Sequence, residues 1–202
     1  MICENEKPAR VDVYLAEMPE GDVVYPVFPR QREDELLGVS SVVTRREKYH
    51  AWRLLEYALR ASLGLSMEQA APYRSGSGKW MSALAEFSIS HAGGVVAVAV
   101  SKAPVGIDVE KCGRTLDRGF AERMLTDREL SSLKEGDDEI LSVWCKKEAL
   151  FKMRGEARFI PRGTESFGEP IHLEKILLPS GEYMLAVSPG AEAKVTVNIC
   201  RI

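Results

Sequence analysis

The amino-acid sequence predicts an α+β fold built from two similar lobes with a cleft between them. The chain of 202 residues is long enough for one large domain or two small ones. Each half carries one long helical pattern and several strand patterns, and the halves divide near Ser101–Pro104. We therefore expect an N-terminal lobe at residues 1–102 and a C-terminal lobe at residues 103–202, with the segment GIDVE bordering the cleft.

The composition is typical of a globular protein that stays in the cytoplasm. Hydrophobic residues make up 45% of the chain and charged residues 28%, which argues against disorder. The net charge of −3 argues against a general nucleic-acid binder, and the longest apolar run, VVAVAV, is too short to cross a membrane. No C-x-x-C spacing occurs, so we expect reduced thiols at Cys3, Cys112, Cys145 and Cys200.

The first half begins with a strand pattern and continues into a long helix. Residues 10–18 are predicted to form a strand, whereas residues 29–41 are polar and only loosely periodic, so their structure stays open. From Thr44 the apolar residues recur at three and four positions, which is the spacing of a helix stripe, and Gly64 is the expected end. The stripe consists of Tyr49, Trp52, Leu55 and Leu59.

A Gly/Ser-rich connector leads from this helix to two strands joined by a tight turn. The connector, residues 70–80, contains Lys79. Residues 87–90 alternate between apolar and polar side chains, and residues 91–94 form the expected turn. Residues 95–100 are apolar on both faces, which predicts a central strand.

Two pairs of polar residues in this half are candidate binding groups. Ser90 and His91 lie at a strand end, where binding groups are often placed, but without an acid partner the pair does not indicate a hydrolase. Arg46 and Arg53 are seven residues apart and flank the helix stripe, so they could reach a shared anion. Solvated arginines beside the core would show the same spacing.

The second half contains two short helices, one long helix and a run of strands. Thr126 and Glu129 have the spacing of a capping box, so one helix should end near Leu125 and another should start at Asp127. Residues 140–154 carry the apolar pattern of a long helix. The strands expected after it are residues 171–178, 183–188 and 194–202, with a turn at residues 179–182.

Two acids interrupt the apolar segment at residues 104–112. Because side chains alternate across a strand, Asp108 and Glu110 share one face with Gly106. The other face is apolar and consists of Val105, Ile107 and Val109. The segment by itself favours a half-exposed edge strand with solvated acids, and the alternative is two carboxylates that face a functional cleft.

The long helix of the second half also aligns polar groups. Trp144, Glu148 and Lys152 follow one another at four-residue steps, so they lie along one helix face. Glu148 and Lys152 are spaced for an i, i+4 ion pair in the favourable order. Most such pairs are surface contacts worth about tenths of a kcal/mol, so the spacing alone leaves a functional role open.

Taken together, three segments resemble the 4′-phosphopantetheinyl transferase superfamily. FSISHA, VGIDVE and WCKKEALFK occur in this order, and the resemblance covers residues 79–155. The chain length is similar to that of the monomeric surfactin-synthetase-activating type, whose two lobes are related by a pseudo-twofold axis with the active site between them. The sequence departs from the family at two positions: Trp80 follows Gly78-Lys79 where proline is frequent, and Ser88 replaces a common asparagine.

The resemblance implies roles for particular residues. Mg²⁺, or Mn²⁺ in its place, would be held by Asp108, Glu110 and Glu148, and these hard oxygen donors suit such cations. Glu148 would also take the proton from the attacking hydroxyl, and Lys152 would neutralise the leaving group. The expected contacts to the phosphates of coenzyme A are Arg46, Arg53, Lys79, Ser90 and His91, with Arg53 preferred over Arg46.

The function implied is transfer of the 4′-phosphopantetheine group from coenzyme A to a serine of an apo acyl or peptidyl carrier protein, with release of 3′,5′-ADP. We expect a cytoplasmic monomer that binds neither nucleic acid nor membrane. Arginines at positions 114, 118, 123 and 128 could steer an acidic carrier. The alternatives are a non-catalytic module that binds coenzyme A or a carrier, and a metal-dependent phosphohydrolase that uses the same acids.

Overall fold

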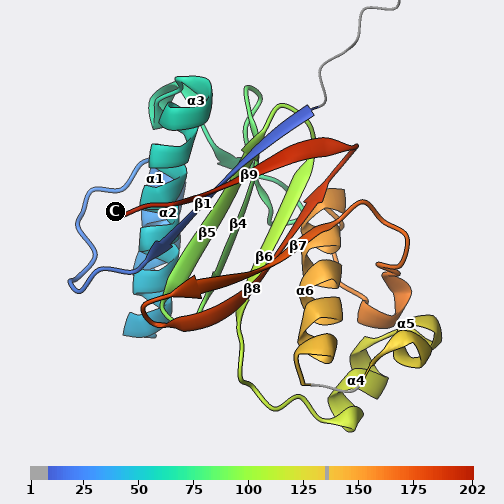
Figure 1. Cartoon of the computed structure of the whole chain (residues 1–202). Helices are drawn as coiled ribbons and strands as arrows, with labels where there is room; N and C mark the ends of the chain where they lie inside the picture. The colour runs from blue at the N-terminus through green and yellow to red at the C-terminus, as the bar shows by residue number, and fades with distance from the viewer. Residues whose placement is uncertain (1–8, 135–136) are drawn as a thin grey trace, which may run out of the picture.

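The computed structural model describes residues 9–134 and 137–202, and their strands form two main sheets (Figure 1). The first sheet has the order β4 (Glu86–Ala92), β5 (Val95–Ser101), β1 (Ala9–Glu17), β9 (Ala193–Ile199). The second has the order β6 (Val105–Lys111), β8 (Gly181–Pro189), β7 (His172–Leu178). Neighbouring strands are antiparallel except β1 and β9, which are parallel. The mixture of sheets and helices confirms the predicted α+β class.

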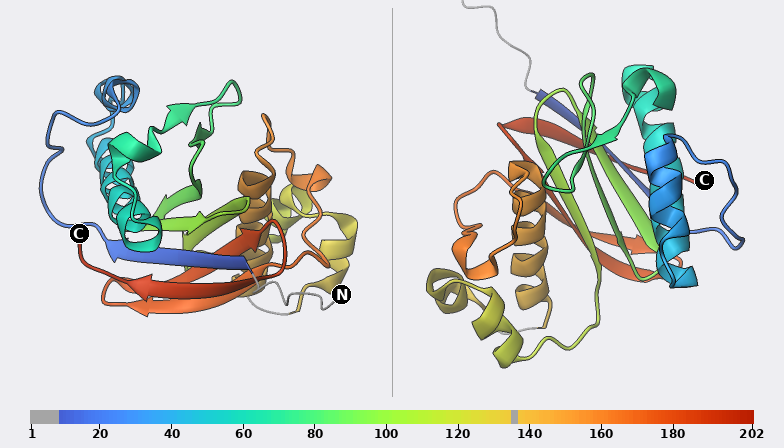
Figure 2. Two further views of the ribbon diagram at one scale, coloured as in Figure 1. Left: turned by 90° about the horizontal axis from the view of Figure 1, so that it is seen from above. Right: turned by 180° about the vertical axis from the view of Figure 1, so that it is seen from behind.

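The two long helices, α2 and α6, lie on opposite sides of the strands, and shorter helices and turns occur in the connecting segments (Figure 2). The helices are α1 (Arg30–Leu37), α2 (Val42–Leu63), α3 (Met67–Ala70), α4 (Arg118–Met124), α5 (Asp127–Ser132) and α6 (Asp137–Arg154). A small hairpin pairs β2 (Tyr73–Arg74) with β3 (Trp80–Met81), and a 3₁₀ turn spans Pro161–Gly163. The sequence patterns located α2 and α6 but did not predict α1, α3 or this hairpin.

Helix α2 begins and ends where its capping residues dictate. The Ser41 hydroxyl accepts a hydrogen bond from the Thr44 N–H at 3.2 Å, so the helix starts two residues before the expected Thr44. Gly64 ends it in the left-handed conformation, φ 69°, as predicted. The predicted stripe is buried against one face of the first sheet, where it meets Phe87, Val96, Val98 and Val100.

The two sheets pack face to face, and α6 covers the far face of the second sheet. Val13, Ala97 and Ile107 belong to the apolar cluster between the sheets. The cluster under α6 contains Leu141, Cys145, Ala149, Met184 and Ala186. The apolar face predicted for β6 is therefore core, as expected. Its acid-bearing face is also covered, which makes the reading of a half-exposed strand with solvated acids wrong.

Gly106 allows α6 to lie directly against β6. A Cβ atom at this position would lie 1.9 Å from the Ala149 carbonyl oxygen and 2.4 Å from the Met153 amide nitrogen. Both atoms belong to the main chain of α6, so no rotamer change could relieve the clash. The absence of a side chain at Gly106 thus determines how closely the helix approaches the acids of β6.

The chain order of the elements repeats once. The series β1–α2–β4–β5 gives the sheet order β4-β5-β1, and the series β6–α6–β7–β8 gives the equivalent order β7-β8-β6. The strand β9 follows the second series but pairs with β1 of the first sheet, so the predicted strand at residues 194–202 does not stay beside its neighbours in sequence. Strand β4 also continues to Ala92, which shortens the turn expected at residues 91–94.

The remaining predictions about the helices and thiols concern local features. The capping box of Thr126 and Glu129 is present, and α4 and α5 separate where expected. Cys112, Cys145 and Cys200 are free thiols, while Cys3 lies outside the described residues. Among the helices of the described chain, none combines the length and apolar composition needed to cross a membrane.

Candidate active site

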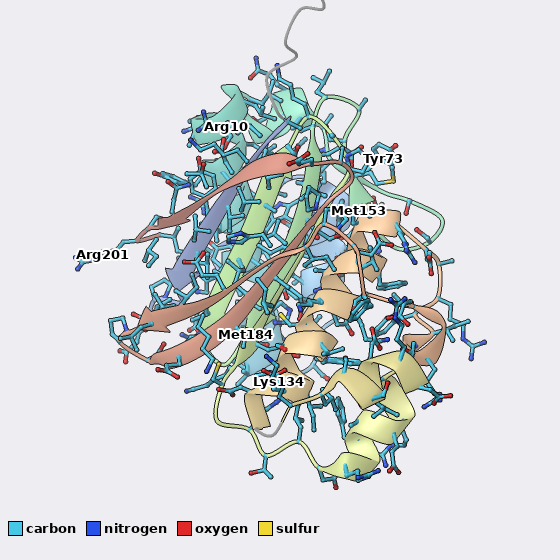
Figure 3. The ribbon with its side chains drawn as sticks, turned by 45° about the vertical axis from the view of Figure 1, so that its right-hand side comes forward. Arg10, Tyr73, Lys134, Met153, Met184 and Arg201 are labelled. Carbon is cyan, nitrogen blue, oxygen red and sulfur yellow. The ribbon has the colours of Figure 1, made fainter. Side chains whose placement is uncertain are left out.

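The predicted acids lie where β4, β6 and α6 meet. Strands β4 and β6 are edges of different sheets, and side chains rather than a backbone ladder connect them. The Ser88 hydroxyl accepts a hydrogen bond from the Ile107 N–H at 3.1 Å, and the Ser90 hydroxyl accepts one from the Val109 N–H at 3.3 Å. Figure 3 shows α6 along these strands, with Met153, which follows Lys152, near one end and Lys134 near the other.

Asp108 is the most enclosed of the predicted acids, with 4% of its surface exposed. Its Oδ1 accepts hydrogen bonds from the Lys152 ammonium at 2.6 Å and from the Ser90 hydroxyl at 2.8 Å. Its Oδ2 is buried and has no hydrogen-bond partner among the described residues. A buried carboxylate oxygen without a partner is costly, so this atom is the natural position for a missing ligand.

Lys152 pairs across the helix–strand interface rather than along its own helix. The predicted i, i+4 pair with Glu148 is replaced, among the described ion pairs, by the contact with Asp108. Burial lowers the pKa of Lys152, but the charge and hydrogen bond of Asp108, together with the charge of Glu148, outweigh it and raise the pKa overall. Lys152 therefore keeps its proton beside the acids.

Glu148 and Glu110 experience the opposite effect. Burial raises the pKa of Glu148 to about 7, and the charges of Asp108 and Glu110 add to this while Lys152 opposes it. Burial and Asp108 also raise the pKa of Glu110. Burial and the neighbouring carboxylates thus both disfavour the charged forms of Glu148 and Glu110, and Lys152 offsets them only in part.

Glu110 is held in place by aromatic and basic neighbours. The Trp144 indole N–H donates to Glu110 Oε1 at 3.1 Å, and Arg114 lies 3.4 Å from Glu110 Oε2. The Trp144 ring packs between Phe120 and Phe159, with ring centroids 5.4 and 5.5 Å away. Trp144 was predicted to share a face with Glu148, and its contact with Glu110 explains how this face reaches β6.

The acids do not form a closed metal site in this structure. Within residues 9–134 and 137–202, no group of three or more His, Cys, Asp or Glu side chains lies close enough together to hold a metal ion. Lys152 contacts Asp108, and Trp144 contacts Glu110. The donors nevertheless fit Mg²⁺ or Mn²⁺, because all are carboxylate oxygens and Asp108 Oδ2 has no hydrogen-bond partner within the described part of the chain.

Three of the predicted phosphate contacts lie near the acids: Ser90, which bonds to Asp108, together with Lys79 and His91. The Lys79 ammonium donates to the Lys152 carbonyl oxygen at 2.9 Å, and both residues line a cavity of about 270 Å³ that also contacts Trp80. His91 Nδ1 lies 3.4 Å from Glu47. Burial lowers the pKa of His91 despite Glu47, and the nearby charge of Lys152 lowers it further.

Arg46 and Arg53, in contrast, make their contacts elsewhere. Arg46 donates to the Pro19 carbonyl oxygen at 3.0 Å. Arg53 pairs with Glu56 at 2.5 Å and lines a different cavity, beside Val24, Phe28 and Met67. The seven-residue spacing does place both arginines near one side of α2, but the α2 residue that contacts His91 is Glu47.

A basic cluster beside His91 was not predicted from the sequence. Glu35 accepts hydrogen bonds from Arg32 at 2.7 Å and from Lys48 at 2.8 Å, and the Arg74 guanidinium forms an ion pair with it at 2.9 Å. Burial opposes the effect, but Lys48 and Arg32 lower the pKa of Glu35 to about 2, and the same two charges contribute to lowering the pKa of His91. Three cations around one carboxylate leave excess positive charge. The three basic residues come from separate segments of the sequence, and only Arg32 lies in residues 29–41, whose structure stayed open.

Comparisons with known proteins agree with the sequence motifs. Residues 104–187 match the model of the 4′-phosphopantetheinyl transferase superfamily. The chain is 33% identical over 93 residues to the 4′-phosphopantetheinyl transferase ffp of Bacillus subtilis, a match that covers 44% of this chain and 40% of the relative. It is 32% identical over 122 residues to a 4′-phosphopantetheinyl transferase of Bacillus pumilus, covering 56% of this chain and 51% of the relative. The chain thus spans about half the length of the curated relatives it matches.

Proposed function

We propose that this chain, whose residues 104–187 carry the sequence pattern of the 4′-phosphopantetheinyl transferase superfamily, transfers 4′-phosphopantetheine from coenzyme A to a serine of an apo acyl or peptidyl carrier protein. The observation that carries the proposal is Asp108, bonded to Lys152 and Ser90 with one oxygen left unpartnered. Asp108 and Lys152 belong to the matched region, residues 104–187, and Ser90 contacts it through Asp108. The carboxylates of Glu110 and Glu148 lie close to Asp108.

The side chains divide the chemistry between them. The carrier hydroxyl oxygen bonds to the phosphorus that bears pantetheine, the bond from that phosphorus to 3′,5′-ADP breaks, and Glu148 accepts the hydroxyl proton. Lys152 offsets the negative charge that grows on the departing phosphate. Asp108, Glu110 and Glu148 would hold Mg²⁺ or Mn²⁺, and the bound cation would supply charge neutralisation at the pyrophosphate.

We assign coenzyme A to the surface that runs from Lys152 past His91. Lys79 and His91 keep their expected roles as phosphate contacts, supported by the cavity that Lys79 and Lys152 share. Arg46 and Arg53 are not included, because their side chains bind the Pro19 carbonyl oxygen and Glu56. In their place we add the excess positive charge of the cluster around Glu35, formed by Arg32, Lys48 and Arg74.

An acidic carrier would approach along the arginines that follow β6. Arg114 touches Glu110, and Arg128 covers the Phe167 ring at 4.1 Å, so a basic surface continues from the acids toward α5. Arg118 is exposed but already paired with Glu122, which limits what it adds. Arg123, on α4, is the fourth arginine of this proposed surface. The contribution expected from these charges is mainly to the association rate and its salt dependence.

We further propose that residues 1–102 and 103–202 form two lobes related by a pseudo-twofold axis, with the site between them. The repeated sheet orders β4-β5-β1 and β7-β8-β6 support this, and β9 is then an exchange of one strand from the second lobe to the first. The chain would act as a cytoplasmic monomer, without nucleic acid or membrane, since the free thiols suit a reducing compartment.

Mass spectrometry of an apo-carrier incubated with the protein, coenzyme A and Mg²⁺ tests the proposed activity. Transfer adds about 340 Da, the approximate mass of the phosphopantetheinyl group, to the carrier. Release of free phosphopantetheine without an adduct would instead identify the phosphohydrolase alternative. Tight binding of coenzyme A or carrier with neither product, across a panel of carriers, would identify a non-catalytic module.

Chelation should abolish the activity. Three carboxylates that repel one another need a cation to face a pyrophosphate, so excess EDTA is expected to stop product formation, and added Mg²⁺ or Mn²⁺ should restore it. The rate of adduct formation measures both effects. Undiminished transfer in EDTA would show that Lys152 and the basic residues suffice without a metal.

Replacement of Lys152 should slow turnover strongly. Lys152→Met keeps the apolar stem but removes the charge beside Asp108, and we expect kcat to fall by roughly 10²-fold or more. Lys175→Met is the matched control, because Lys175 also pairs with an aspartate, Asp138, but on the exposed surface. Steady-state rates with a saturating carrier measure the difference. Equal rates for both variants would reduce the Lys152 ion pair to a structural contact.

A further inference from the structure

We propose that Ser90 is a positioning residue, which links the two sheets and leaves Oδ2 of Asp108 as the oxygen that faces the cation. Only the part of the inference that concerns the cation at Asp108 rests on the proposed function. It replaces the phosphate contact expected for Ser90, and it extends to Ser88, for which no role was predicted.

The free edge of β6 faces β4 (Figure 1). Just after β6, the Cys112 N–H donates a hydrogen bond to the Glu182 carbonyl oxygen, next to β8. Because N–H groups alternate in direction along a strand, the even-numbered residues of β6 point their N–H groups toward β8 and the odd-numbered residues point theirs away from it. The N–H groups of Ile107 and Val109 therefore have no ladder partner. They are buried, and a buried N–H group needs an acceptor.

Two serines of β4 provide those acceptors. Ser88 and Ser90 alternate with the apolar residues of β4 and are 5% and 6% exposed, so water does not compete for their hydroxyls. Their oxygens accept from the Ile107 and Val109 N–H groups. The sheets are thus joined through side chains, which sets their separation at this point without merging them into one sheet.

Ser90 has no hydrogen-bonding capacity left for a phosphate. A hydroxyl offers one proton and two lone pairs. The proton goes to Asp108 Oδ1 at 2.8 Å, and the lone pairs receive the Val109 N–H at 3.3 Å and the Lys152 ammonium at 3.1 Å. Every bond of this hydroxyl therefore lies within the protein, and a phosphate contact would require one of them to break.

The same arrangement distinguishes the two oxygens of Asp108. Ser90 and Lys152 both bind Oδ1, which fixes the carboxylate plane, and Oδ2 stays buried with no partner among residues 9–134 and 137–202. Ser88 has no contact with the carboxylate among the described hydrogen bonds, although it joins the strands in the same way. The two serines thus share a structural role, and only Ser90 should influence a cation bound at Asp108.

Amide hydrogen exchange measured residue by residue by NMR tests the link between the sheets. Ser88→Ala should speed exchange of the Ile107 amide, and Ser90→Ala should speed exchange of the Val109 amide, each by roughly 10-fold. Ser188→Ala is the control, because Ser188 is also buried on a neighbouring strand but its hydroxyl lacks a partner. Unchanged exchange at both amides would overturn the proposed link.

Binding of Mn²⁺ alone, followed by electron paramagnetic resonance, tests the positioning role without any carrier. Ser90→Ala should weaken Mn²⁺ binding by about 10-fold, while Ser88→Ala and Ser188→Ala should leave it unchanged. Equal Mn²⁺ affinity in all three variants would reduce Ser90 to a sheet link. Weaker metal-free binding of coenzyme A by Ser90→Ala, with unchanged exchange at Val109, would restore the phosphate contact and overturn the proposal.

Two outcomes separate this proposal from the proposed function. If the parent protein binds Mn²⁺ but modifies no carrier, the serine measurements still decide the role of Ser90. If Ser90→Ala does not fold, Ser90→Cys takes its place in both measurements, because a thiol is a weaker donor and acceptor than a hydroxyl. The exchange pattern of Ser88→Ala must also match the prediction. Failure of either overturns the inference.

Discussion

Glu148→Gln is expected to bind coenzyme A almost as the parent protein does, while its turnover falls by roughly 10² to 10⁴-fold. Glutamine keeps the volume of the side chain and one oxygen that can act as a ligand, but it cannot accept a proton. Asp108→Ala should behave differently, because it removes the carboxylate that binds Lys152 and Ser90. We expect that variant to need more Mg²⁺ and to bind coenzyme A more weakly.

Calorimetric titration with coenzyme A and single-turnover rates at several Mg²⁺ concentrations distinguish the two roles. Glu139→Gln is the matched control, since Glu139 lies on α6 nine residues before Glu148 and therefore on the opposite face of the helix. If raised Mg²⁺ restores the turnover of Glu148→Gln, or if this variant loses coenzyme A affinity as Asp108→Ala does, then Glu148 is only a ligand. His91 or a water molecule would then be the base.

Gly106→Ala should destabilise the protein by about 3 kcal/mol or more, at the upper end of the cost of overpacking. The added methyl group would overlap the main chain of α6 at 1.9 Å from the Ala149 carbonyl oxygen, so the helix must move away from β6. That movement would also separate Lys152 from Asp108, and we therefore expect the remaining folded protein to have lost most of its activity.

Urea-induced unfolding measures this loss, with Gly76→Ala as the control. A Cβ atom at Gly76 would meet nothing within 4 Å, and this glycine does not need a left-handed backbone. We expect the control to change the free energy of unfolding by less than about 1 kcal/mol. Similar stability for both variants would contradict the close approach of α6 to β6.

Local features of this protein were predictable because their causes lie within a few residues. The stripe from Tyr49 to Leu59 predicted α2, and its stop at Gly64 was confirmed. The capping box of Thr126 and Glu129 was also confirmed. Alternation in β6 correctly assigned its apolar face to the core, since side-chain direction in a strand follows from the backbone alone.

The candidate site was predicted in its residue types but not in its contacts. The metal-ligating and catalytic roles of Asp108, Glu110, Glu148 and Lys152 stay predictions until the variants are measured. The sequence suggested that Lys152 pairs with Glu148 four residues away, whereas the structure pairs it with Asp108 on another element. Helical spacing could not reveal this, because the partner belongs to a strand whose approach depends on Gly106.

Features that depend on residues close together in sequence could be predicted, whereas contacts between residues far apart in sequence could not. The class of fold, the two long helices and the acids that share one face of β6 could all be predicted from sequence patterns. The hydrogen-bonded group of Ser90, Asp108 and Lys152 became visible only in the folded chain, since Ser90 is 18 residues and Lys152 is 44 residues from Asp108. The tertiary structure also showed Arg46 bound to Pro19 and Arg53 bound to Glu56, and it gathered Arg32, Lys48 and Arg74 around Glu35. Periodicity reports which way a side chain points from its own element, whereas the partner it meets depends on how separate elements pack.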